Sequence, residues 1–149
     1  MLRNITILDV EEIQKICNYE LGYDVDLSIV EKQIEKLTND RKHHIIIGYE
    51  NDRVRKIVGF VHAEFYESLY METGLNILAL AVDSKFQGQG IGKKLMSSIE
   101  EYALKNNISF IRLNSNVYRM EAHKFYERIG YVCDKTQKRL IKNFREKRR

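Results

Sequence analysis

The chain has no proline and no tryptophan, and it has only two cysteines among 149 residues. It contains no apolar run of about eighteen residues, the least that a membrane-spanning helix needs, so we expect no membrane span. The first residues, MLRNITILDVEEI, lack an apolar core segment and carry acids early, which argues against a secretory signal. Cys17 and Cys133 have no metal-like spacing, which predicts reduced thiols in the core of a cytoplasmic protein. No zinc-like cluster of histidines and cysteines is present, so we expect no metal.

Repeats, low-complexity tracts and linkers are also lacking, and 44% of the residues are hydrophobic, which predicts a single domain over residues 1–149. The net charge of +4 is uneven, because residues 138–149 hold seven basic side chains and one acidic. Such a tail can contact RNA or a ribosome. A solvated chain end explains it more simply, so we do not expect nucleic-acid binding.

Hydrophobic periodicity predicts strands and helices in the order β-α-α-β-β-β-α-β-α-β-β. Capping boxes at Asp9 with Glu12 and at Ser28 with Glu31 begin the first two helices. The other helices are expected over 90–105 and 118–129, and the strands over 4–8, 43–49, 56–66, 74–82, 108–114, 131–134 and 137–143. This pattern predicts an α/β (α+β) three-layer fold, with a mixed sheet between helices on both faces.

The segment 76–94, NILALAVDSKFQGQGIGKK, is the most informative one: an apolar strand, a polar turn, a glycine-rich loop and the start of a helix. Gly88, Gly90 and Gly92 leave backbone N–H groups uncovered at a helix N-terminus, which suits a phosphate group. Lysines 85, 93 and 94 add positive charge. A Walker loop would need Ser or Thr at position 94, and a dinucleotide loop would need its third glycine one residue later. The remaining pattern is Q-x-x-G-x-G, which begins at Gln87.

With this loop the chain resembles the GNAT N-acetyltransferase superfamily, which uses [Q/R]-x-x-G-x-[G/A] to bind the pyrophosphate of acetyl-CoA. Residues 122–131, AHKFYERIGY, resemble the second signature of that superfamily, A-x-x-[FL]-Y-x-x-x-G-[FY]. The resemblance covers nearly the whole chain. It implies a GNAT-like acyl-CoA N-acyltransferase fold with a mostly antiparallel sheet, in which the strands carrying Leu80 and Leu113 splay apart to admit the pantetheine arm.

The resemblance also implies a set of acetyl-CoA contacts. The strand residues Leu80, Ala81 and Val82 would receive the thioester and pantetheine, and a backbone N–H near Leu80 would polarise the acetyl carbonyl. Asn114 and Asn116 follow the next strand, where either can hydrogen-bond pantetheine or substrate. Arg119 stands where many relatives have a cofactor-binding asparagine, and an arginine there can reach a phosphate instead. The residues expected at the pyrophosphate are Gln87, Gly88, Gln89, Gly90, Ile91, Gly92 and Lys93.

Acetyl transfer from a thioester to an amine needs a base, a donor for the developing oxyanion and an acid for the leaving thiolate. Tyr126 is the expected acid and a cofactor contact, because the resemblance places its phenol near the sulfur. Glu64 is our preferred base. His62 lies two residues away on the same strand face, and Glu72 is a third alternative. Asn76 occupies the position where protein-lysine members have a glutamate, and an amide cannot take a proton.

The sequence is therefore interpreted as an N-acetyltransferase that passes the acetyl group of acetyl-CoA directly to a primary amine of a small molecule or a protein. Acid-rich segments at 19–26 and 64–72 favour a small cationic amine. The alternative is a non-catalytic acyl-CoA-binding module whose basic tail docks to RNA or a ribosome, and Tyr126 argues against it. The oligomeric state is left open, with a homodimer among the alternatives.

Overall fold

The structure is a computed structural model that describes residues 1–145. The chain divides into two compact units, Met1–Asn114 and Ser115–Arg149, which are described separately. The last four residues of the basic tail lie outside the described part, and the expectation of a single domain over 1–149 stays a prediction.

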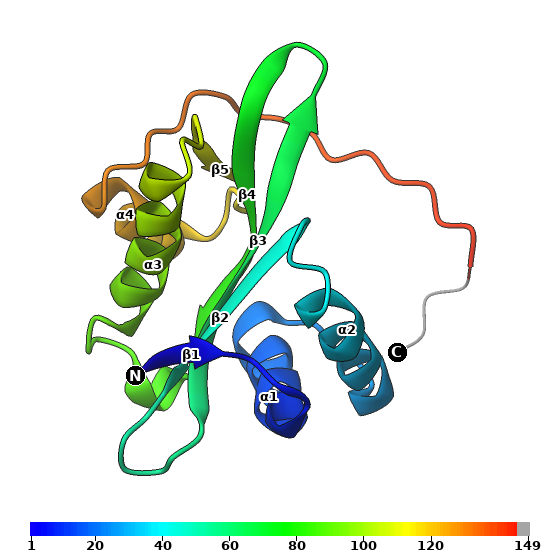
Figure 1. Ribbon diagram of the computed structural model, residues 1–149, viewed down its shortest axis with the longest axis vertical. Helices are drawn as coiled ribbons and strands as arrows, with labels where there is room; N and C mark the ends of the chain where they lie inside the picture. The colour runs from blue at the N-terminus through cyan, green and yellow to red at the C-terminus, as the bar shows by residue number, and fades with distance from the viewer. Residues whose placement is uncertain (146–149) are drawn as a thin grey trace. The chain divides into compact units, whose positions relative to one another are not determined.

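The first unit is built on a five-stranded sheet in the order β1-β2-β3-β4-β5 (Figure 1). The first four strands pair antiparallel to their neighbours, and β5 pairs parallel to β4. The mixed, mostly antiparallel sheet expected from the sequence is therefore confirmed. Its strands are β1 (Leu2–Asn4), β2 (His44–Glu50), β3 (Ile57–Ser68), β4 (Met71–Val82) and β5 (Ile111–Leu113).

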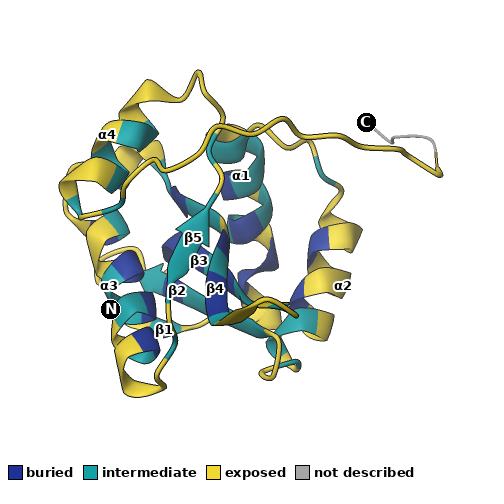
Figure 2. Ribbon diagram, turned by 90° about the horizontal axis from the view of Figure 1, so that it is seen from above, coloured by how far each residue is buried: buried dark blue, intermediate teal, exposed yellow. Residues whose placement is uncertain are grey.

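Helices cover both faces of this sheet, as the three-layer prediction requires (Figure 1). On one face α1 (Val10–Leu21) and α2 (Leu27–Thr38) bury an apolar cluster against strand residues such as Phe60 and Ala81. On the other face lies α3 (Ile91–Lys105), whose Leu95, Met96 and Ile99 are fully buried. Figure 2 shows the buried residues concentrated in the sheet and along the inner sides of these helices. The buried core of this unit thus lies on both faces of the sheet.

The pairing of β4 with its two neighbours changes near its middle. Ala63 pairs with Ile77 and His62 pairs with Ala79, so Leu78 is an extra residue that forms a bulge. The parallel ladder with β5 ends at the pair Ile77 and Leu113. Beyond this point β4 runs on to Val82 without β5, because β5 itself ends at Leu113, and the expected splay of the two strands stays a prediction.

The first helix begins directly after Asp9, as expected, but the second begins earlier than expected and neither predicted capping box forms. Residues 7–9 form a short 3-10 helix, η1 (Ile7–Asp9), rather than the end of a strand, and its capping box is made by Thr6 and Asp9. Neither α1 nor α2 has a side-chain cap, and α2 begins one residue before Ser28. The predicted box at Asp9 was wrong because its carboxylate is already engaged by Arg3 and Thr6.

The second unit contains one helix in its described part, α4 (Met120–Arg128). Gly130 follows it with a φ of 101°, as predicted for a left-handed residue after the helix. The terminal hairpin predicted over 131–134 and 137–143 was wrong, since residues 131–145 form no strand and almost all are exposed. The expectation of a core thiol at Cys133 was therefore also wrong, because this residue lies outside any strand and is exposed.

Candidate active site

The glycine-rich loop joins β4 to α3 through a short 3-10 helix, η2 (Ser84–Phe86). Gly88 and Gly90 have φ angles of 80° and 79°, a left-handed conformation that costs other residues about 1 kcal/mol or more. A Cβ atom added at either glycine would meet nothing within 4 Å. The backbone of the loop is therefore shaped by glycine and left uncovered by side chains.

The N-terminus of α3 presents unused hydrogen-bond donors at this loop. Gly90 is the N-cap and has no side-chain cap bond. The first backbone bond of the helix runs from the Lys94 N–H to the Gly90 carbonyl, 3.0 Å away, so the N–H groups of Ile91, Gly92 and Lys93 have no acceptor within the helix. These donors and the positive end of the helix dipole together favour an anion.

Gln87 has a structural role in the loop that the sequence did not reveal. Its side-chain amide donates to the Val82 carbonyl, 2.9 Å away, and lies 3.4 Å from a carboxylate oxygen of Glu20 on α1. The other oxygen of Glu20 accepts a hydrogen bond from the Ser84 N–H. These contacts hold the loop against the end of β4 and the last turn of α1.

The backbone of Leu80 points to the free edge of β4. The Asp83 N–H donates to the Val58 carbonyl on β3, 2.8 Å away. Because peptide groups alternate along a strand, the N–H of Leu80 and of Val82 point away from β3. This is the side from which Gln87 reaches the Val82 carbonyl. With β5 paired only as far as Ile77, the Leu80 N–H is available to a ligand.

A row of polar side chains crosses the sheet just before the bulge. Glu64, Asn76 and Arg112 are direct neighbours on β3, β4 and β5. The Asn76 amide donates to Glu64 at 2.8 Å, and its oxygen accepts from Arg112 at 2.7 Å. Arg112 also donates to the Asn114 side chain, 2.9 Å away. Glu64 and Asn114, both expected at the site, are thus brought into one network.

The other two candidate bases, His62 and Glu72, do not join this row of hydrogen-bonded side chains. Nε2 of His62 is 2.9 Å from Nδ1 of His44, the cross-strand neighbour of Glu64. Burial and the nearby His44 lower the pKa of His62 from 6.5 to about 4, although the Glu64 charge opposes them. His62 is therefore neutral at pH 7. Glu72 lies near the turn between β3 and β4, where it is exposed and accepts a hydrogen bond from Ser109.

Tyr126 lies on α4, in the second unit, with its ring edge-on against Phe125 and Tyr131. Burial raises the pKa of its phenol, while the charge of Arg119 lowers it. The hydroxyl has no hydrogen-bond partner among residues 1–145. Arg119 is the exposed N-cap residue of this helix, and Asn116 is engaged in the preceding turn by the Tyr118 N–H. A protonated phenol with an unused hydroxyl is suited to donate a proton.

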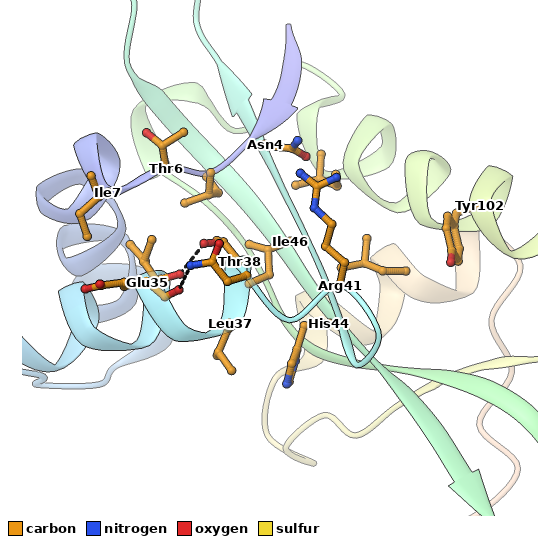
Figure 3. A pocket seen from close by; sticks show the side chains of 15 residues that line it. Asn4, Thr6, Ile7, Glu35, Leu37, Thr38, Arg41, His44, Ile46 and Tyr102 are labelled. Carbon is orange, nitrogen blue, oxygen red and sulfur yellow. Dashed lines mark hydrogen bonds between the residues drawn. The ribbon is translucent and has the colours of Figure 1, made fainter.

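A cavity of about 780 Å³ lies elsewhere, between α2 and the β1–β2 edge (Figure 3). Arg41, His44 and Tyr102 are among its lining residues, but Glu64, Asn76 and the glycine-rich loop are not. Within residues 1–145, no group of three or more histidines, cysteines and acids is arranged to hold a metal ion. No helix of this part is long and apolar enough to cross a bilayer.

A glycine-rich loop with free N–H groups at the start of α3 therefore lies at the end of a β4 segment that β5 leaves uncovered. The family model described as "Acetyltransferase (GNAT) family" matches residues 7–131. The chain therefore belongs to the GNAT family of acetyltransferases, as the two sequence signatures predicted.

Curated relatives and solved structures agree with this assignment. N-acetylaspartate synthetase of Homo sapiens is 35% identical over 75 residues, an alignment that covers 50% of this chain and only 24% of that protein. Aminoalkylphosphonate N-acetyltransferase of Salmonella typhimurium is 26% identical over 130 residues, which cover 87% of this chain and 83% of that enzyme. A GNAT family acetyltransferase of Staphylococcus aureus superposes with a TM-score of 0.72 at 25% identity, covering 94% and 98% of the two chains. In its alignment with N-acetylaspartate synthetase, this chain spans only about a quarter of that protein's length.

Proposed function

We propose that the chain is an acetyl-CoA-dependent N-acetyltransferase that acetylates a primary amine directly, in a ternary complex. The observation that carries this proposal is the glycine-rich loop, whose three free N–H groups at the start of α3 suit a pyrophosphate. Gln87, Gly88, Gln89 and Gly90 would form its outer part, and Ile91, Gly92 and Lys93 would supply the donors. The Lys93 side chain is exposed and can add charge.

Acetyl-CoA supplies an activated acetyl group as a thioester. The free Leu80 N–H would polarise the acetyl carbonyl, with the edge of Ala81 and Val82 beside it and Asn114 positioned for the pantetheine arm. Arg119 would meet a phosphate. These assignments rest on the exposed β4 edge and on the family to which the chain belongs.

The reaction forms an N–C bond and breaks the C–S bond of the thioester. The amine loses a proton, which we assign to Glu64 directly or through water, and the leaving thiolate gains one, which we assign to Tyr126. Glu64 is preferred over His62 because Asn76 holds it at the sheet opening, whereas a pKa of about 4 makes His62 a weak base. The raised pKa of Tyr126 keeps its phenol protonated at neutral pH.

A small-molecule acceptor is favoured over a protein. One relative is named for making N-acetylaspartate and another for acetylating aminoalkylphosphonates, and both names indicate small amines. We place the protein in the cytoplasm, without a metal, and leave its oligomeric state to measurement.

Calorimetric titration with acetyl-CoA tests the loop. Gly90→Asp places a carboxylate where the pyrophosphate is proposed, so binding should be lost, whereas EDTA should leave wild-type binding unchanged. Gly22→Asp is the matched control. Gly22 has a φ of 75° and nothing within 4 Å of an added Cβ, so the substitution carries a similar backbone cost outside the loop. Equal acetyl-CoA binding by folded Gly90→Asp and Gly22→Asp would remove the loop from the site.

A further inference from the structure

Arg112 is a partly buried cation without an acidic partner. Its guanidinium donates from Nη1 to Asn76 and from Nη2 to Asn114, both of them neutral amides. Among residues 1–145, no carboxylate forms an ion pair with it. A charge that is partly withdrawn from water is normally balanced by an opposite charge. The guanidinium therefore has an unmet preference for an anion.

The side chain of Arg112 is also held in place. Its Cζ lies 4.8 Å from the centre of the Tyr66 ring, and that ring packs edge-on against Phe110 at 6.3 Å. A guanidinium has five N–H donors, of which the two amides use two. The remaining N–H groups have no acceptor in the described part of the chain. A fixed, planar set of open donors is the arrangement that binds a carboxylate or a phosphonate with two parallel hydrogen bonds.

Glu64 lies on the opposite side of Asn76 from Arg112. A carboxylate only accepts and a guanidinium only donates, so these two contacts fix the orientation of the Asn76 amide. The three residues lie opposite one another on adjacent strands, so the Cα atoms of Glu64 and Arg112 are about 10 Å apart. One face of the sheet thus offers a negative and a positive group, separated by a neutral amide.

This pair of charges borders the place proposed for acetyl transfer. Asn76 lies two residues before the bulge at Leu78, where β4 begins to run on without β5. The other acids of the segment 64–72 do not join it, because Glu67 bonds to Thr73 and Glu72 bonds to Ser109. Glu64 is therefore the acid of this segment that lies in one row with Arg112.

We propose that the acceptor is an amine that carries an anionic group a few bonds from its nitrogen, an amino acid or an aminoalkylphosphonate. Arg112 binds the carboxylate or phosphonate, Glu64 faces the ammonium group and Asn76 sets the spacing. This deepens the proposed function and rests on it. It replaces the cationic acceptor, such as a polyamine, that the acid-rich segments favoured.

Steady-state kinetics at saturating acetyl-CoA test this assignment with matched acceptors. Aspartate and 2-aminoethylphosphonate represent the two anions, and n-propylamine and putrescine represent a neutral tail and a cationic one. The wild-type protein should have the highest kcat/KM for one of the anionic acceptors, and that arm identifies the preferred anion. Arg112→Met keeps the aliphatic stem and should raise the KM for that acceptor roughly 10- to 100-fold, as expected for a lost charged hydrogen-bond pair.

Three further readouts keep the outcomes separate. Arg112→Met should lower kcat/KM for the anionic acceptor far more than for n-propylamine, which has no anion for Arg112 to bind, and Arg112→Lys should recover only part of the loss. Arg53→Met, at an exposed arginine in the β2–β3 turn, is the matched control and should behave as wild type. A wild-type preference for n-propylamine or putrescine, or an equal loss for all four acceptors in Arg112→Met, would overturn the anionic acceptor and leave the acetyltransferase proposal standing.

Acetyl-CoA binding without acetylation of any amine would overturn the proposed function. In that case calorimetric titration with aspartate and with 2-aminoethylphosphonate, in the presence of CoA, tests the anion site separately. If neither compound binds, the anion site at Arg112 is overturned as well.

Discussion

His62 makes the stability of the fold depend on pH in a defined window. In the folded chain its pKa is about 4, mainly because burial disfavours the charged imidazolium, with His44 adding to the effect and Glu64 opposing it. In the unfolded chain the pKa returns to 6.5. Between these two values the unfolded state binds more protons than the folded state, so the free energy of unfolding falls as the pH falls.

The size of this effect follows from the two pKa values. Each pH unit of separation is worth about 1.4 kcal/mol, so His62 should account for a loss of roughly 3 kcal/mol between pH 7 and pH 4. The loss should begin near pH 6.5 and end near pH 4, because His62 is protonated in both states below that. Urea unfolding followed by circular dichroism at one-unit pH intervals measures it.

Comparison with variants isolates His62 from the other titrating groups. His62→Gln retains a polar side chain but cannot titrate, so its stability should fall about 3 kcal/mol less than wild type over this range. His43→Gln is the control, since the side chain of His43 is 70% exposed and pairs with Asp40 on the surface. Parallel pH profiles for wild type and His62→Gln would refute the burial argument.

Two further substitutions, each with a control, test the proposed acid Tyr126 and the buried carboxylate of Asp9. Tyr126→Phe removes only the hydroxyl and should lower kcat roughly 10²-fold at nearly constant acetyl-CoA affinity. An unchanged kcat, with chemistry rate-limiting, would assign Tyr126 to packing, and Tyr118→Phe is a control because Tyr118 is 87% exposed. Asp9→Asn should cost about 3 kcal/mol in urea unfolding, because it removes the buried carboxylate that Arg3 contacts at 2.8 and 2.9 Å. Glu50→Gln changes the other carboxylate that Arg3 contacts and should cost about 1 kcal/mol. Equal losses of unfolding free energy for Asp9→Asn and Glu50→Gln would contradict the larger contribution expected of the buried Arg3–Asp9 pair.

The fold was largely predictable because its elements carry strong local patterns. The apolar run before Val82 became strand β4, and the stripe of Ile91, Leu95 and Ile99 became the buried side of α3. The side-chain caps were less predictable, because Arg3 reaches the Asp9 carboxylate from another element and α1 keeps Asp9 as its N-cap residue without a capping bond. The hairpin expected after Gly130 was wrong because alternation of apolar and polar residues does not by itself supply a strand partner. Residues 131–145 pair with no strand in the described structure.

The site could be predicted only where its signal is local in the sequence. The loop from Gln87 to Gly92 could be recognised by its glycines, and in the structure Gly88 and Gly90 have positive φ angles and open space around them. Arg112 was missed because its partners, Asn76 and Tyr66, lie on other strands. Their alignment depends on the strand register and on the parallel pairing of β5, and neither can be read from residue types alone.

Acetyl transfer by the chain can be tested directly with one measurement. Purified protein is incubated with acetyl-CoA and an amine panel that includes aspartate and 2-aminoethylphosphonate, and CoA thiol and N-acetylated product are measured together by mass. We predict equimolar release of CoA and formation of one N-acetylated amine, both dependent on the amine. Tight binding of acetyl-CoA with no acetylated product from any amine would contradict the account and favour a non-catalytic acyl-CoA-binding module.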